Sequence, residues 1–163
     1  MTPDRAQPLK QLFCYTIIKM TEENVTFPNP PITEALLDIR VNLPKEITLD
    51  TLLSFQNEIK EQFPNKKERH TGAFQIKTGV APSIFTSSDR IDGYMFCASD
   101  NKKIVQARLD GFTFNKLKPY SKWELFSQEA KCLWEHYVKI AKPVNIVRLA
   151  LRYINRIELP LPF

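Results

Sequence analysis

Three arginines near the end of the chain carry the clearest binding chemistry. Arg148, Arg152 and Arg156 alternate with apolar residues in the segment VNIVRLALRYINRIE. At about 3.3 Å per residue in a strand, successive arginines are about 13 Å apart on one face. The planar guanidinium group fits carboxylates and phosphates. The pattern predicts a ligand-binding sheet face formed by these arginines and bordered by Arg40 and Asp38 from an earlier strand.

A purely structural role explains the same arginines. Charged residues on neighbouring strands pair across a solvated sheet face, and Asp38 and Glu158 are available as acidic partners. Under this alternative the arginines stabilise the sheet and bind nothing.

Two further basic segments have competing interpretations. Residues 66–70 are rich in lysine and arginine, which suits either phosphate contacts or a solvated loop. Residues 112–120 mix aromatic and basic side chains, as single-strand-binding sheets do. Packing of Phe112 and Phe114 in the core explains the second segment equally well.

One pair of residues has the spacing of half a metal site. Cys132 and His136 are four residues apart, so they share a helix face, and Glu129 lies near them in sequence. No other ligands follow at a recognisable spacing, and the only other histidine is His70. An exposed, unrelated pair is therefore the favoured interpretation, and no metal or cofactor is expected.

Familiar catalytic signatures are missing from the sequence. The chain contains no GxSxG, HExxH, P-loop or GxGxxG motif, and its 4 glycines argue against a glycine-rich phosphate loop. No catalytic residue is assigned, and the sequence leans away from an enzyme.

Composition sets broad limits. A chain of 163 residues with 43% hydrophobic residues is long enough for one domain with its own core. The net charge of +5 permits an anionic partner. Three cysteines without a CxxC spacing favour a reducing, cytoplasmic compartment. No apolar run approaches the roughly 20 residues of a membrane span.

Hydrophobic periodicity predicts the elements that position the arginines. We expect helices from Thr48 to about residue 63 and from a capping box at Ser121–Glu124 to about residue 141. Residues 65–72 and 82–92 read as a charged loop and an irregular polar segment. The expected strands span residues 36–43, 73–78, 94–98, 104–109, 112–117 and 146–159.

The order of these elements is β-α-β, a β meander, then α-β. It predicts an α+β fold with a largely antiparallel sheet and two helices packed on one face. Residues 1–19 are expected to be an extension outside the core, because Met20 begins a natural-looking start. Residues 20–163 are expected to form a single α+β domain, with the front part of a longer protein as the open alternative.

Two stretches together resemble a sporadically distributed prokaryotic protein family. The first is the NPPIxEAxxDIR opening at residues 29–40, and the second is the RxxLRYINRI signature at residues 148–157. The resemblance covers about residues 27–160 and implies a longer protein that begins near Met20. It implies no activity and transfers no role to any residue, although the patchy distribution suggests an association with mobile elements.

Three functions follow from these observations. The first is a non-catalytic binding module that recognises a protein or an anionic ligand through the arginine-bearing face. The second is a nucleic-acid-binding protein that uses the arginines and the basic segment. The third is an enzyme whose site is completed by a missing C-terminal region.

Overall fold

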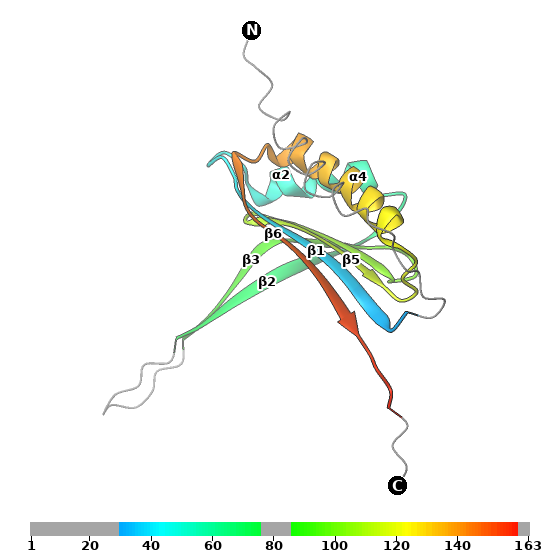
Figure 1. Ribbon diagram of the computed structural model, residues 1–163. Helices are drawn as coiled ribbons and strands as arrows, with labels where there is room; N and C mark the ends of the chain where they lie inside the picture. The colour runs from blue at the N-terminus through cyan, green and yellow to red at the C-terminus, as the bar shows by residue number, and fades with distance from the viewer. Residues whose placement is uncertain (1–29, 76–85, 160–163) are drawn as a thin grey trace, which may run out of the picture.

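The computed structural model describes residues 30–75 and 86–159 (Figure 1). Its elements, in chain order, are β1 (Ile32–Asn42), α2 (Leu49–Leu53), α3 (Phe55–Ile59), β2 (Asn65–Gln75), β3 (Thr86–Cys97), β4 (Lys103–Arg108), β5 (Gly111–Leu117), α4 (Trp123–Ala141) and β6 (Asn145–Asn155).

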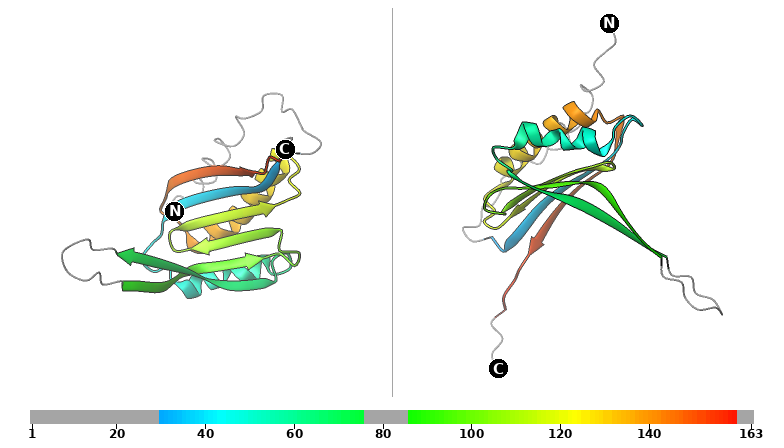
Figure 2. Two further views of the ribbon diagram at one scale, coloured as in Figure 1. Left: turned by 90° about the horizontal axis from the view of Figure 1, so that it is seen from below. Right: turned by 180° about the vertical axis from the view of Figure 1, so that it is seen from behind.

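The described strands form one 6-stranded sheet in the order β2-β3-β4-β5-β1-β6. Every neighbouring pair is antiparallel. The helices lie together over one face of this sheet (Figures 1 and 2). The predicted α+β architecture is confirmed, and the first helical segment is split into α2 and α3.

The core lies between the sheet and the helices. Alternate residues of β1, from Ala35 to Val41, point into it and are at most 5% exposed. Trp134 and Tyr137 of α4 pack on Phe112 of β5, with ring centroids 5.7 Å away in both cases. Burial of each large apolar side chain contributes about 1.5–3 kcal/mol to the stability of the fold. The helices therefore stay packed on this face of the sheet, and the opposite face is left uncovered by them.

Several local predictions are confirmed by the turns and helix ends. Leu109 and Asp110 join β4 to β5, which begins at Gly111, and Asn101 adopts a left-handed φ of 56° in the preceding turn. Thr48 is the N-cap of α2 and its side chain accepts from the Thr51 N–H. The last helix ends at Ala141, as its apolar periodicity predicted.

Other predictions were wrong. The residue that caps α4 is Lys122, without a side-chain hydrogen bond, so the capping box at Ser121 does not form. The helix expected from Thr48 breaks at Ser54. The last strand ends at Asn155 rather than at residue 159, because β1 has no further residues to pair with it.

The largest error concerns β2 and β3. Residues 65–72 and much of 82–92 were predicted as loops, yet β2 starts at Asn65 and β3 at Thr86. These two strands form a ribbon that projects from the helical layer (Figure 1). Residues 65–71 of β2 are mostly exposed, so this part of the strand needs no apolar alternation. The expected extension, residues 1–19, lies outside the described residues.

Candidate functional site

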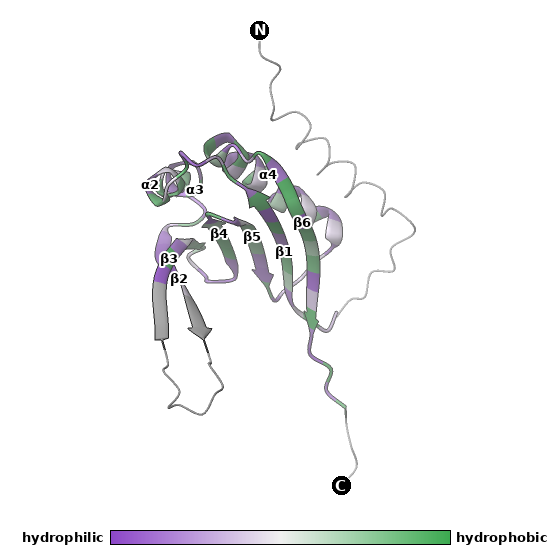
Figure 3. Ribbon diagram, turned by 90° about the vertical axis from the view of Figure 1, so that its left-hand side faces the viewer, coloured by the Kyte–Doolittle hydropathy of each residue, from purple (hydrophilic) through white to green (hydrophobic). Residues whose placement is uncertain are grey.

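The sheet is curved, and the helices lie over its convex side (Figure 3). Strand alternation directs a second set of side chains to the opposite side, which we call the concave face. On the central and β6 side of the sheet this face comprises Glu34, Leu36, Asp38, Arg40, Ile104, Gln106, Arg108, Thr113, Asn115, Leu117, Arg148, Ala150, Arg152 and Ile154. Most of these residues are polar, in contrast to the core on the other side.

Asp38 is the centre of an ion-pair network on the concave face. Its side chain is only 7% exposed, and its carboxylate accepts from Arg108 at 2.7 Å and from Arg148 at 2.5 Å. Thr113 donates from 3.0 Å and the Arg40 Nε from 3.4 Å. Four donors from four neighbouring strands therefore converge on one carboxylate.

The pKa of Asp38 reflects two opposing effects. Burial alone would raise it, but hydrogen bonds from Arg148 and Arg108 outweigh burial and hold the pKa well below its ordinary value. Asp38 is ionised at neutral pH and all its acceptor capacity is engaged. It is therefore suited to ordering guanidinium groups and unsuited to abstracting a proton.

Arg108 is the buried partner of Asp38, with a side chain only 4% exposed. A Cβ at Gly93 would lie 2.8 Å from the Arg108 Cα, and one at Gly111 would lie 3.0 Å from its Nη2. The two glycines therefore leave the room that Arg108 occupies. Burial lowers the pKa of Arg108, and hydrogen bonding to Asp38 counteracts the effect.

Asp110 and Tyr137 complete the surroundings of Arg108. Asp110 pairs with Arg40 and lies 3.2 Å from the Arg108 Nε. The Tyr137 hydroxyl donates to the Arg108 carbonyl at 2.8 Å, which links the network to α4. With Asp38 and Arg148, the network has two carboxylates and three guanidinium groups, so it carries one net positive charge.

The three predicted arginines lie in different environments. Arg148 faces Arg40 in the sheet register and binds Asp38, while its side chain stays 53% exposed. Arg156 follows the end of β6 and pairs with Glu158 at 2.8 Å, with both side chains exposed. Arg148 therefore pairs across the sheet, as the structural alternative expects, whereas Arg156 pairs with a neighbouring residue beyond the sheet.

Arg152 differs from both. It lies opposite Leu36 on the concave face and is exposed. Within residues 30–75 and 86–159 it has no ion-pair partner. Glu34, the next acidic residue on this face of β1, accepts instead from Asn115. The structure thus brings Arg40, Asp38, Arg148 and Arg152 together on one face and leaves Arg156 beyond it.

Sequence patterns did not identify Arg108 and Thr113, which hold Asp38 in place. Arg108 lies within the strand expected over residues 104–109, and no role was predicted for it. Arg108 lies opposite Gly93 and Gly111 in the sheet, and these glycines make room for it. An arginine between strands that carry glycines is the feature that could have identified it.

The other basic and aromatic segments have structural explanations. Arg69 and Thr71 of β2 both bind Asp92, and these contacts hold the pKa of Asp92 below its ordinary value despite burial. Phe112 and Phe114 are fully buried in the core. The mixture of aromatic and basic residues at 112–120 therefore does not form a stacking surface.

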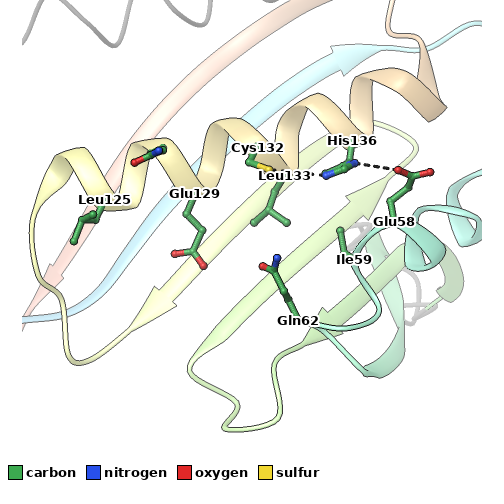
Figure 4. Close-up of a pocket in the computed structure, with 9 residues that line it drawn as sticks. Glu58, Ile59, Gln62, Leu125, Glu129, Cys132, Leu133 and His136 are labelled. Atoms are coloured by element: carbon green, nitrogen blue, oxygen red, sulfur yellow. Dashed lines mark hydrogen bonds and ion pairs between the residues drawn. The ribbon is translucent and has the colours of Figure 1, made fainter.

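A groove of about 280 Å³ lies between α3 and α4 (Figure 4). In it, Cys132 Sγ is 3.9 Å from His136 Nε2, and His136 Nδ1 is 3.2 Å from Glu58. Lys139 also contacts Glu58, and Lys139 and His136 together lower the pKa of the Glu58 carboxyl group. Glu129, the third ligand considered from the sequence, pairs instead with Lys103 and Lys116.

This groove does not form a metal site. Cys132 faces one imidazole nitrogen of His136 and Glu58 faces the other. An ion bound to either nitrogen would therefore lie next to only one of these two residues. No group of three histidine, cysteine, aspartate or glutamate residues in the described part of the chain is arranged to hold a metal ion.

Comparisons with protein-family models, curated proteins and solved structures find no match to this chain. Among the described helices, none has the length and apolar character needed to cross a membrane.

Proposed function

We propose that this chain is a non-catalytic binding module that recognises an anionic protein partner through the concave face. The observation that carries the proposal is Arg152, an exposed arginine with no ion-pair partner among the described residues, on the same face as the half-exposed Arg148. Guanidinium groups bind carboxylates with charge-assisted, often bidentate hydrogen bonds.

The Asp38 network supports the proposal by preparing Arg148. Asp38 holds one Nη2 atom of Arg148 at 2.5 Å, while 53% of the side chain remains accessible. A side chain that is already ordered loses less conformational entropy when a ligand binds. The network keeps one net positive charge, so its carboxylates do not neutralise the face completely. This remaining charge favours an anion near Arg148.

Nucleic acid is the competing class of partner. Nucleic-acid affinity depends on many phosphate contacts and falls steeply with salt. The concave face has few arginines near the β6 edge of the sheet, and Leu36 and Ala150 lie among them. This mixture of charged and apolar residues suits a protein better than a row of phosphates. Phe112 and Phe114, the aromatic residues considered for stacking, point into the core and offer no surface to a base.

The experiment compares binding of poly-L-glutamate and single-stranded oligothymidylate to the wild-type chain, Arg152→Glu and Lys60→Glu. Lys60 is an exposed lysine that follows α3, on the helical side of the sheet, and gives a matched change in charge. We expect Arg152→Glu to weaken poly-L-glutamate binding about 10-fold or more, as for the loss of a hydrogen bond to a charged group. Lys60→Glu should change it less than about 3-fold.

Equal effects of the two substitutions would show that only net charge matters and would overturn the proposed site. Tighter binding of oligothymidylate than of poly-L-glutamate would favour the nucleic-acid alternative. In that case a plot of log affinity against log salt concentration should have a slope of about −0.7 for each phosphate contacted.

A further inference from the structure

We infer that the anionic partner is an extended protein segment that pairs with β6 as an additional antiparallel strand. Its acidic side chains would lie four residues apart, opposite Arg148 and Arg152. The inference rests on the proposed function and adds to it the conformation and sequence pattern of the ligand.

The first observation is the exposed apolar surface around β6. This strand pairs with β1 on one side and has no second neighbour among the described strands. Of the six large hydrophobic side chains that are exposed in the described residues, five lie on β6 or its flanks, with exposures of 46–72%. They are Val144, Val147, Ile154, Ile157 and Leu159. Such a concentration marks an interaction surface.

The second observation is the direction of the main-chain groups of β6. The Ile154 carbonyl accepts from Thr33, and the Arg156 N–H donates to the Pro31 carbonyl, so both groups point toward β1. Successive residues of a strand alternate in this direction. The N–H and C=O groups of Leu149, Leu151 and Tyr153 therefore point away from β1 and form a hydrogen-bonding edge.

The side chains of β6 specify which strand fits this edge. Arg148, Ala150 and Arg152 lie on the concave face. Opposite residues of an antiparallel strand lie about 4.5–5.5 Å away, so acidic residues facing the two arginines and a small residue facing Ala150 complement this side. Apolar residues at the intervening positions would cover Leu149 and Leu151, which are partly buried against the core.

The other edge of the sheet lacks these properties. From residue 65 to 71, β2 is mostly exposed and carries Lys66, Lys67, Glu68 and Arg69. Mixed charges of this kind protect an edge strand from pairing. The contrast identifies β6 as the edge suited to strand addition.

Charge also distinguishes an acidic partner from a second copy of the chain. In a symmetric antiparallel pairing centred on Ala150, Arg148 and Arg152 of the two copies would face one another. Like charges directly opposite each other destabilise a sheet. The arginines thus disfavour this self-pairing and favour a strand with acidic residues at the same positions.

The test uses the full chain and the peptide TEVAVET, whose glutamates face the two arginines when its alanine faces Ala150. The control TEEVAVT has the same composition, but its adjacent glutamates lie on opposite faces of a strand. A third peptide carries N-methyl groups on both valines of TEVAVET, whose N–H groups point to β6. A fourth is N-methylated at the alanine, whose N–H points away.

We expect TEVAVET to bind at least 10-fold more tightly than either TEEVAVT or the valine-methylated peptide. The affinity of the alanine-methylated peptide should lie within about 3-fold of that of TEVAVET. Hydrogen exchange at the Leu149, Leu151 and Tyr153 amides should slow at least 10-fold on binding. Exchange at Ala150 and Arg152 should change less, because these N–H groups already point to β1.

Three results would overturn strand addition. Equal affinity for all four peptides, together with weaker binding to Arg152→Glu, would reject it while retaining the proposed function. Binding that is insensitive to Arg152→Glu would reject both. Protection of Leu149, Leu151 and Tyr153 without peptide, rising with protein concentration, would identify a second copy as the occupant.

Discussion

The Asp38 network on the concave face and the Cys132–His136–Glu58 groove on the helical face both combine acidic and basic groups, but water reaches them differently. Asp38 and Arg108 have side chains at most 7% exposed. The side chains of His136 and Glu58 are 34% and 33% exposed. Charge interactions strengthen as water is excluded, so breaking an ion pair should cost much more in the Asp38 network than in the groove.

The largest effect that would sharpen this comparison is expected for Asp38→Asn. Removing the carboxylate takes away the buried counter-charge of Arg108 and leaves it only the half-exposed Asp110. Breaking a buried pair of this kind costs about 3–5 kcal/mol. Urea unfolding followed by circular dichroism measures the loss. Glu58→Gln is the matched control in the groove and should leave the unfolding midpoint almost unchanged. Equal losses would contradict the assigned difference between the two regions.

A smaller effect is expected from pH. The folded-state pKa of Asp38 is below its ordinary value, so the unfolded chain binds more protons in acid. Its stabilising contribution is complete above about pH 5 and falls progressively as the pH drops below about 4. Unfolding measured across this range should show a shallower slope for Asp38→Asn. An unchanged slope would exclude Asp38 as a source of acid sensitivity.

Tyr137→Phe tests how the network is attached to α4. The substitution removes the 2.8 Å hydrogen bond from the hydroxyl to the Arg108 carbonyl and keeps the buried ring. We expect a loss of about 0.5–1.5 kcal/mol in urea unfolding. No loss would show that the network does not depend on this contact.

The smallest effect on stability is expected in the groove. In a Cys14→Ser background, exposed Cys132 should react with an aromatic disulfide reagent in the folded protein, whereas buried Cys97 should react only after unfolding. Cys132→Ser should leave the melting temperature and poly-L-glutamate binding unchanged. Altered binding would mean that the groove contributes to recognition.

Sequence patterns predicted the parts of the fold that separate water from the core. Alternation in β1, β4, β5 and β6 and the apolar stripe of α4 were sufficient for the α+β sheet-and-helix arrangement. The first part of β2 was missed because residues 65–71 are mostly exposed and show no apolar alternation, whereas residues 73–78 and 94–98 were predicted as strands. The resemblance of residues 27–160 to a prokaryotic family stays a prediction.

The candidate site was predictable only in part. Alternation placed Arg148 and Arg152 on one face, and proximity of Arg40 and Asp38 followed from the expected sheet. Sequence spacing did not show that Asp38 would receive Arg108 and Thr113, because these contacts depend on the register of strands that are 70 or more residues away. The same spacing extended the strand to residue 159, although its register with β1 ends at Asn155.

The most direct test of anion recognition observes the guanidinium groups themselves. Arginine Nε–H signals are recorded by nuclear magnetic resonance while poly-L-glutamate is titrated into the full chain. We expect the Arg152 signal to shift most, Arg148 to shift less because Asp38 already holds it, and buried Arg108 to remain nearly unchanged. An unshifted Arg152 signal during saturable binding would contradict recognition through the concave face.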